Sequence, residues 1–437
     1  MTDAGCGAVA DDIVITGGTL VDQSGSRRGD VRIRDGRIVE VAESLTVGDE
    51  RVIDAAGLLV TPGFVDLHTH LREPGMPEAE TIESGSRAAA LGGYTAVVAM
   101  PNTDPTQDSV EVVEWVAARG RAAGWCDVYP SGSITIGRAG RELTPIADLA
   151  AVGVRLFTDD GSGVQDDAVM RRALEYAGDL DVRLAQHCEV ATLTRGAVMH
   201  EGHCCSTLGL PGWPALAEEL MVHRDIELVR LTGSSVHLLH LSTARSVELV
   251  REAKADGLAV TAEATPHHIS LTDERLRGFD AVFKVNPPLR TMADIEAVRD
   301  GLIDGTIDAI ATDHAPHPRH HKERPLEEAP PGMLGLETAL GVARASLECS
   351  WEHLVGALSW RPAAIAGVAD RHGRPFIAGE PANICVIDPD LQWRVDPAAL
   401  ASRSTNTPFI DIDLTGRVRH TVHDGRVVVA DGSAVTR

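Results

Sequence analysis

The stretch Phe64-Val65-Asp66-Leu67-His68-Thr69-His70-Leu71-Arg72-Glu73 decides the fold, because an apolar run ends there in two histidines one residue apart. Alternate side chains of an extended strand point the same way, so His68 and His70 project from one face. Two imidazoles at one strand end can share a metal ion, and Zn²⁺ is the natural candidate. An isolated His-x-His is more often a hydrogen-bonded pair at a strand edge, so the rest of the chain has to decide.

Composition and charge exclude several classes of protein. The chain has 437 residues, of which 43% are hydrophobic and 24% charged, and this length predicts two or three globular domains. The formal net charge of -24 argues against a nucleic-acid or anionic-membrane partner, because its field repels phosphates. We find no signal peptide and no long apolar run, and the seven cysteines are scattered, which is typical of reduced thiols. We therefore expect a cytoplasmic protein.

The two ends of the chain have the same style. Short β-type runs separated by turns fill residues 12–62 and return at 383–388 and 421–429, and Asp35-Gly36 between two such runs predicts a hairpin. We expect one small β-sandwich domain assembled from both termini, residues 1–62 and 370–437. Two unrelated β appendages are the alternative.

The middle of the chain, residues 63–369, alternates apolar strand-like runs with helical patterns, which predicts a parallel sheet. The expected strands are 63–68, 94–99, 126–131, 153–157, 182–187, 236–240, 258–263 and 308–312, and the expected helices include 107–123, 165–178, 243–256 and 293–304. Eight βα units over about 300 residues fit an α/β fold of the (β/α)₈ TIM-barrel type.

Polar residues follow the carboxyl ends of these strands, where the active sites of such barrels lie. The candidate metal ligands are His68, His70, one aspartate of Asp159-Asp160, His187, His240 and Asp313. Four imidazoles and two carboxylates suit two metals that share a bridge. A water between two dications would be acidified toward hydroxide, and Asp313 is the natural carrier of its proton.

Longer motifs extend this interpretation over nearly the whole chain. They are Pro62-Gly63-Phe64-Val65-Asp66-Leu67-His68-Thr69-His70, Ala99-Met100-Pro101-Asn102-Thr103, Phe157-Thr158-Asp159-Asp160-Gly161, Gln186-His187-Cys188-Glu189, Thr265-Pro266-His267-His268, Lys284-Val285-Asn286-Pro287-Pro288 and Ala311-Thr312-Asp313-His314-Ala315-Pro316-His317. With them the chain resembles the cyclic amidohydrolases, and within these the bacterial type I dihydroorotases. The resemblance implies the barrel, the composite β domain, two zinc ions per subunit, and reversible closure of N-carbamoyl-L-aspartate to L-dihydroorotate in pyrimidine synthesis.

The resemblance also implies residue roles. Residues 155–160 contain no lysine, whereas hydantoinases, allantoinases and other dihydroorotase types place a carboxylated lysine there, so Asp160 is the expected bridge. Arg72 can pair with a carboxylate in a bidentate manner, although it could instead pair with Glu73. By the match, Arg72, Asn102 and His317 hold the substrate carboxylate, and Asn286, Pro331 and Gly332 contact the ring.

Two further segments have weaker signals. Residues 317–332 are polar and proline-rich without periodicity, so we expect a loop that acts as a lid, with a solvent loop as the alternative. His320 and His321 in it are expected to be ordinary loop residues. The cluster His200-Glu201-Gly202-His203-Cys204-Cys205 matches no standard zinc spacing, and we expect no metal there.

Two rival functions stay open. One keeps the chemistry but takes a hydantoin or another cyclic ureide as substrate, which the missing lysine argues against. The other is a non-catalytic subunit that supports aspartate transcarbamoylase, which the full set of expected ligands argues against. We expect a homodimer that acts on a small molecule, and an association with aspartate transcarbamoylase is left open.

Overall fold

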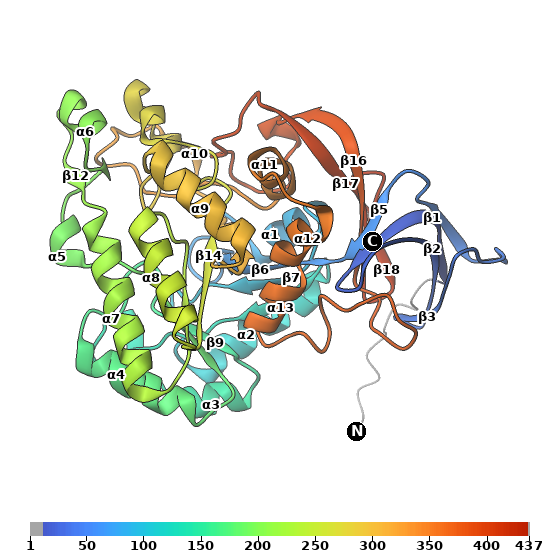
Figure 1. Cartoon of the computed structure of the whole chain (residues 1–437), viewed down its shortest axis with the longest axis horizontal. Helices are drawn as coiled ribbons and strands as arrows, with labels where there is room; N and C mark the ends of the chain where they lie inside the picture. Colours follow the sequence, from blue (N-terminus) through green and yellow to red (C-terminus); the bar gives the residue numbers. More distant parts are fainter. Residues whose placement is uncertain (1–11, 436–437) are drawn as a thin grey trace.

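Strands from both ends of the chain lie in one mixed sheet. The computed structural model describes residues 12–435, and this sheet lies on the right in Figure 1. Its strands are β1 (Ile13–Asp22), β2 (Gly25–Arg34), β3 (Arg37–Ala42), β4 (Arg51–Asp54), β5 (Leu59–Pro62), β16 (Ile384–Arg394), β17 (Asp413–His423), β18 (Arg426–Ala430) and β19 (Ser433–Ala434). The order is β19-β18-β17-β16-β5-β1-β2-β3, with β4 beside β1, so β5 and β16 join the two ends of the chain.

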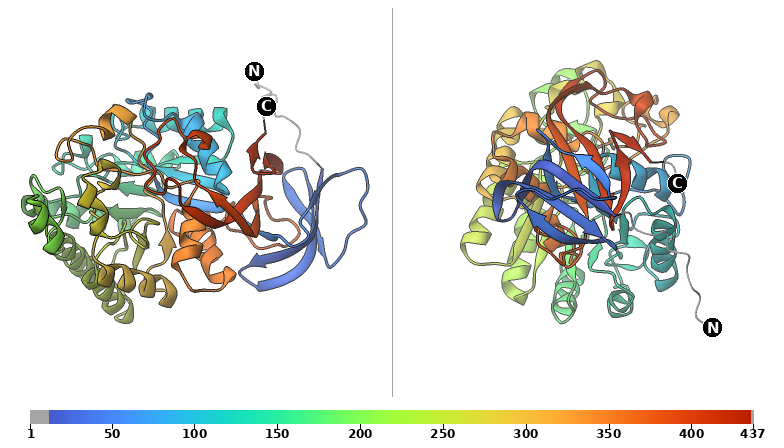
Figure 2. Two further views of the ribbon diagram at one scale, coloured as in Figure 1. Left: turned by 90° about the horizontal axis from the view of Figure 1, so that it is seen from above. Right: turned by 90° about the vertical axis from the view of Figure 1, so that its right-hand side faces the viewer.

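Local sequence explains the hairpin in this sheet. Asp35 and Gly36 connect β2 to β3 with φ angles of 49° and 75°. Positive φ at both central residues is the geometry that a two-residue hairpin turn requires, and Asp-Gly adopts it readily. Side chains from the early and late strands share one buried core, which includes Ile15, Val31, Ile384 and Val422. Figure 2 shows these blue and red strands together in front of the ring of helices.

Eight parallel strands form the centre of the molecule. Three make one sheet, β6 (Phe64–Thr69), β7 (Tyr94–Ala99) and β8 (Asp127–Pro130), and five make another, β9 (Leu156–Thr158), β10 (Arg183–Gln186), β13 (Val236–Leu238), β14 (Val260–Ala264) and β15 (Ala309–Ile310). Isolated parallel bridges join Gly132 to Phe157 and Thr69 to His314, and thereby connect both outer edges of the two sheets. All eight expected strands are confirmed; β7 has the expected ends, and the ends of the others differ by at most three residues.

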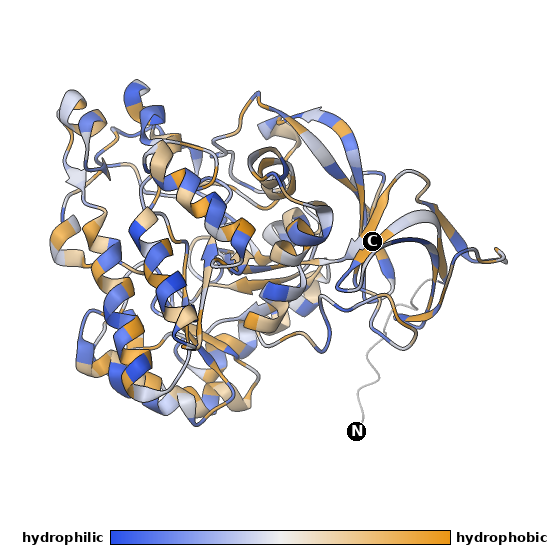
Figure 3. Ribbon diagram, in the orientation of Figure 1, coloured by the Kyte–Doolittle hydropathy of each residue, from blue (hydrophilic) through white to orange (hydrophobic). Residues whose placement is uncertain are grey.

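Helices pack on the outside of these strands. They are α1 (Ile82–Leu91), α2 (Val110–Ala123), α3 (Ile146–Ala151), α4 (Asp167–Gly178), α7 (Leu216–Thr232), α8 (Ala244–Ala255), α9 (Met292–Asp304), α11 (Ala339–Ser346), α12 (Trp351–Leu358) and α13 (Trp360–Ile365). In α4 the buried residues Val169, Met170, Ala173, Leu174 and Ala177 recur at helical spacing, and Figure 3 shows the resulting two-sided colouring of the helices. Asp166 begins α4 by accepting the N–H groups of Ala168 and Val169.

Short elements fill the connections. The insertion after β10 contains α5 (Ala191–Thr194), β11 (Met199–His200), α6 (His203–Leu208) and β12 (Gly212–Trp213). The 3-10 turns are η1 (Ile136–Arg138), η2 (Asp273–Gly278), η3 (Ala281–Phe283) and η4 (Pro397–Ala399). Residues 317–332 include a one-turn helix, α10 (Arg319–Lys322), so the expectation of no helix there was wrong for four residues; one turn is too short for a periodic pattern. Within residues 12–435, no helix is both long and apolar enough to cross a bilayer.

Candidate metal and substrate site

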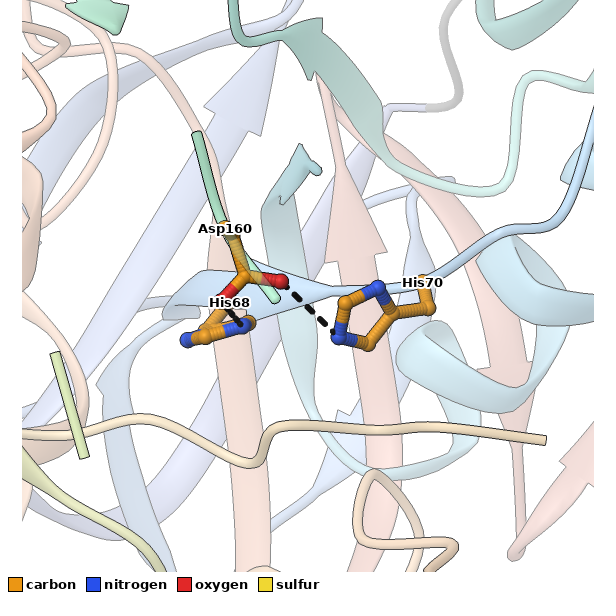
Figure 4. A group of neighbouring side chains, drawn as sticks. All are labelled: His68, His70 and Asp160. Atoms are coloured by element: carbon orange, nitrogen blue, oxygen red, sulfur yellow. Dashed lines mark ion pairs between the residues drawn. The ribbon is translucent and has the colours of Figure 1, made fainter. Parts of the chain in front are cut away.

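Imidazoles and carboxylates from five strand ends meet at one place. The residues are His68 and His70 of β6 and its end, Asp160 after β9, His187 after β10, His240 after β13 and Asp313 after β15, and all are buried. Their possible ligand atoms form two groups of three, one of His68, His70 and Asp160 and the other of Asp160, His187 and His240. Figure 4 shows the first group, with the Asp160 carboxylate facing both imidazoles. Asp160 is the member that the two groups share.

The interatomic distances fit a coordination shell. His68 Nε2 lies 3.3 Å from Asp160 Oδ1, His70 Nε2 lies 3.6 Å from Asp160 Oδ2, and Asp313 Oδ1 is 3.0 Å from His70 Nε2 and 3.5 Å from His68 Nε2. Ligands of a tetrahedral zinc lie about 3.3 Å apart when each bond is about 2.0–2.1 Å. His68 Nε2 is buried and makes no hydrogen bond, which is rare for such an atom unless a ligand satisfies it.

The second group has similar spacing. His187 Nδ1 lies 3.4 Å and His240 Nε2 lies 3.7 Å from Asp160 Oδ1, and the two ring nitrogens are 2.9 Å apart. Nitrogen donors with a carboxylate oxygen are the ligand set that zinc prefers. The residues of both groups therefore fit divalent metal ions of this type.

Outer partners orient three of the imidazoles. His68 Nδ1 contacts Glu263 Oε1 at 3.0 Å, His70 Nδ1 contacts Asn102 Oδ1 at 2.9 Å, and His187 Nε2 contacts Glu189 Oε2 at 3.1 Å. Carboxylate and amide oxygens only accept, so each ring donates one N–H outward and turns its other nitrogen toward the cluster. This arrangement is usual for histidines that bind metal.

The cluster carries an excess of negative charge. Burial alone would lower the pKa of His68, but the Asp160 and Asp313 carboxylates raise that pKa well above its ordinary value. Burial alone would raise the pKa of Asp160, but the positive charge of His68 and hydrogen bonds from His187 and His240 hold it well below the usual range. A site that attracts protons in this way attracts metal cations for the same reason.

The two neighbouring aspartates after β9 point to different places. Asp159 accepts the N–H groups of Ile134 and Thr135 at 2.9 and 3.0 Å and the Thr135 hydroxyl, so it fixes the adjacent loop. Asp160 points into the cluster. The geometry thus assigns the loop role to Asp159 and leaves Asp160 as the candidate bridge.

The backbone is strained where the site is built. Arg72, His240 and Asp313 have φ angles of 60°, 33° and 47°, in the left-handed region that non-glycine residues rarely adopt. Such conformations cost about 1–3 kcal/mol each and gather at functional sites.

A cavity of about 180 Å³ opens directly above the cluster. Its lining contains all six expected substrate residues, Arg72, Asn102, Asn286, His317, Pro331 and Gly332. Arg72 Nε donates to the Pro316 carbonyl at 3.1 Å, and its NH2 lies 3.4 Å from His317 Nε2. Glu73 accepts the N–H of Ile82 at 2.8 Å, and no Arg72–Glu73 ion pair occurs within the described residues.

Sequence reasoning missed several residues of this site. Glu263 lies in the buried strand β14 and joins His68 to His237, whose Nε2 is 3.0 Å from Glu263 Oε2. Asp66 in β6 accepts the N–H of Thr312 at 3.0 Å and thereby ties the first parallel strand to the last. In the sequence, Glu263 and Asp66 are single acidic residues inside apolar parallel strands. A buried acid needs hydrogen-bond partners, and this pattern could have identified both residues. The His200–Cys205 cluster forms no group of three ligands in the described part of the chain.

The overall structure is similar to solved structures of hydantoinases. The structure matches an L-hydantoinase (dihydropyrimidinase) from Arthrobacter aurescens with a TM-score of 0.88 and 24% identity, covering 98% of each chain. A D-hydantoinase from Thermus sp. matches with a TM-score of 0.84 and 23% identity, covering 97% of each chain. At these identities the likeness establishes that the chain shares the overall fold of these hydantoinases.

Comparison of the amino-acid sequence with known proteins identifies the family. The Dihydro-orotase-like family model matches residues 57–246. A dihydroorotase of Mycobacterium tuberculosis is 50% identical over 412 residues, which cover 93% of this chain and 96% of that protein. One of Streptomyces coelicolor is 49% identical over 405 residues, covering 91% and 94%. The chain belongs to the dihydroorotase family.

Proposed function

We propose that this protein is a metal-dependent dihydroorotase that interconverts N-carbamoyl-L-aspartate and L-dihydroorotate in pyrimidine synthesis. The observation that carries the proposal is the position of Arg72 and His317 beside Asp313 in one cavity above the two ligand groups. A guanidinium and an imidazole next to a metal site fit a cyclic amide that carries its own carboxylate. Family membership supports the same substrate.

His68, His70, Asp160 and Asp313 would hold one zinc ion, and His187, His240 and Asp160 a second. Asp160, Asp313, Glu263 and Glu189 contact these four imidazoles, and two divalent cations would balance their four negative charges. When bound, the metal pair supplies Lewis acidity to the amide carbonyl and lowers the pKa of a water.

The remaining lining groups bind and orient the substrate. Arg72, His317 and Asn102 lie on one side of the cavity and suit the carboxylate, for which Arg72 provides a planar fork of donors. Asn286, whose Nδ2 donates to Glu189 Oε2 at 3.1 Å, and the backbone of Pro331 and Gly332 suit the ring amides. Fixing the substrate at both ends presents its amide carbonyl to the cluster.

Asp313 is the proposed proton carrier. Its Oδ1 lies 3.0 Å from His70 Nε2, and its side chain lines the cavity. In hydrolysis its carboxylate takes a proton from the attacking water and delivers it to the departing amide nitrogen. In synthesis the carboxyl group returns that proton by the reverse path.

We also propose that the eight parallel strands form a closed (β/α)₈ barrel of residues 63–369. The bridges between the two central sheets support this closure. The shared core of early and late strands supports a β-sandwich domain built from residues 1–62 and 370–437, although residues 1–11 and 436–437 lie outside the described residues. The cytoplasmic location, the homodimer and an association with aspartate transcarbamoylase stay predictions.

One comparison tests the activity. The purified protein, with its metal content measured by mass spectrometry, is assayed on L-dihydroorotate and on hydantoin. We expect turnover of dihydroorotate and about two zinc ions per subunit. Preferential hydrolysis of hydantoin would favour the hydantoinase function, and no turnover of either compound by zinc-loaded protein would favour a non-catalytic subunit.

A further inference from the structure

A partly buried lysine donates hydrogen bonds to the backbone of residues 330–332, which form one wall of the cavity. Lys322, the last residue of α10, directs Nζ toward three carbonyl oxygens: Pro330 at 3.0 Å, Gly332 at 3.0 Å and Lys284 at 3.3 Å. An ammonium group has three N–H donors and no acceptor, so these carbonyls match its full capacity. Pro330 and Gly332 both line the cavity. A single side chain outside the lining therefore holds two lining residues.

The backbone of residues 330–332 contacts His317, one of the residues proposed to bind the substrate carboxylate. Between the two held residues, the Pro331 carbonyl accepts a hydrogen bond from His317 Nε2 at 2.8 Å. That same nitrogen is 3.4 Å from the Arg72 guanidinium. A small displacement of residues 330–332 would thus move His317 relative to Arg72.

There is little free space to absorb such a displacement. Gly332 has a φ of 139°, and a Cβ atom there would lie 2.8 Å from Ala315 Cβ and 2.9 Å from His317 Nε2. The Gly332 N–H also donates to the Lys284 carbonyl at 2.9 Å, and its carbonyl accepts from Asn406 Nδ2 at 3.1 Å. Hydrogen bonds from Lys322 and Asn406 and to the Lys284 carbonyl therefore hold Gly332 in place. Its remaining side packs against Ala315 and His317.

We propose that Lys322 is a positioning residue, whose side chain holds residues 330–332 against His317 and so sets the geometry of the carboxylate-binding groups. The inference rests on the proposed function, because that function assigns the carboxylate to Arg72 and His317. Residues 317–332 then form an anchored wall of the cavity, in place of the lid that their composition suggested.

The chain provides a matched control. Lys284 Nζ donates to the Leu326 and Glu327 carbonyls at 2.7 and 3.1 Å, so it fastens the same segment with the same chemistry. Neither Leu326 nor Glu327 lines the cavity. A purely structural role for the two lysines predicts similar consequences for both variants, whereas a positioning role separates them.

The test compares Lys322→Met, Lys322→Arg and Lys284→Met in the zinc-loaded protein at about pH 6. Burial and the Lys284 charge lower the pKa of Lys322 to about 7, so this pH keeps the ammonium group protonated. We expect Lys322→Met to raise KM for dihydroorotate about tenfold or more, with kcat and zinc content nearly unchanged, because a hydrogen bond to a charged group is lost. Lys322→Arg should restore part of the loss, and Lys284→Met should leave KM within about twofold.

Hydrogen exchange at the Gly332 amide gives a readout that does not depend on catalysis. We expect this amide to exchange about tenfold faster or more in Lys322→Met and at the unmodified rate in Lys284→Met. Equal increases of KM in both methionine variants, or unchanged exchange in Lys322→Met, would overturn the positioning role. If the unmodified protein turns over neither substrate, the proposed function fails, and the exchange rates still decide whether Lys322 holds the wall.

Discussion

Replacement of Glu263 by glutamine tests whether the partners behind the imidazoles tune the metal site. Glu263 Oε1 and Oε2 accept hydrogen bonds from His68 Nδ1 and His237 Nε2, each at 3.0 Å, and the carboxyl group is fully buried. Glutamine keeps the shape but loses the charge. With its amide oxygen toward His68 Nδ1, the NH₂ group faces His237 Nε2, so His237 has to take its other tautomer, in which Nδ1 donates to the Thr261 hydroxyl. His68 then keeps a hydrogen bond to a neutral oxygen in place of one to a carboxylate.

The expected magnitude follows from these contacts. A hydrogen bond to a charged group contributes about 1.5–3 kcal/mol. Because about 1.4 kcal/mol corresponds to a factor of ten in an equilibrium constant, this loss corresponds to about 10–100-fold. The same range is typical for removal of a partner behind a histidine that binds metal. We therefore expect Glu263→Gln to raise the zinc dissociation constant by about 10–100-fold.

Competition with a chromophoric chelator measures that constant, and Asp127→Asn is the matched control. Asp127 is a partly buried carboxylate that also lies between two imidazoles, His372 at 2.9 Å and His423 at 3.3 Å, but it begins β8 and lies at the opposite end of the parallel strands. The control variant should lose stability and keep its zinc affinity. Unchanged affinity in Glu263→Gln, or an equal loss in Asp127→Asn, would refute the reasoning.

Three further predictions concern the substrate, the proton and the fold. Arg72→Met should raise KM for dihydroorotate by about 10–100-fold and leave KM for its carboxylate-free analogue nearly unchanged, and equal effects on both would show that Arg72 does not bind the carboxylate. Asp313→Ala should lower kcat by about 10²–10⁴-fold or more while the circular dichroism spectrum stays native, and normal turnover would exclude Asp313 as the proton carrier. Burial alone would raise the pKa of Asp127, but hydrogen bonds from His372 and His423 hold it well below the usual range. Its stabilising effect is therefore present above the unfolded pKa of about 3.9 and is lost as the pH falls further. The difference in free energy of unfolding between the unmodified protein and Asp127→Asn should be constant near neutral pH and shrink in acid, and a pH-independent difference would contradict this.

The sequence was most informative where chemistry coincides with a strand end. The alternation of β6 placed His68 and His70 on one face, and the order of strands and helices predicted that residues as distant as His187 and Asp313 share one edge. Strand starts were less predictable: β9 begins at Leu156 instead of 153, because the preceding Val154 is equally apolar and buried. Apolar character alone does not separate a strand from the buried residue that leads into it.

Contacts between strands were beyond sequence reasoning. His237 of β13 pairs in register with Thr261 of β14, and only this register brings His237 to Glu263 two residues further on. No pattern within one strand specifies its register against a neighbour in a fully apolar parallel sheet. The hydrogen bonds from Lys322 to the cavity wall could not be predicted either. Their acceptors are backbone carbonyls, which every residue type carries.

The tie between the first and last parallel strands has a consequence for biosynthesis. Asp66 of β6 accepts the Thr312 N–H, and Thr69 bridges His314, so the residues around position 68 reach those around position 313 only when β15 has been made. During translation the paired histidines leave the ribosome long before Asp313 does. A nascent chain therefore carries an incomplete ligand set, and the complete site can bind its cations only after the last central strand, β15, has been made and has docked.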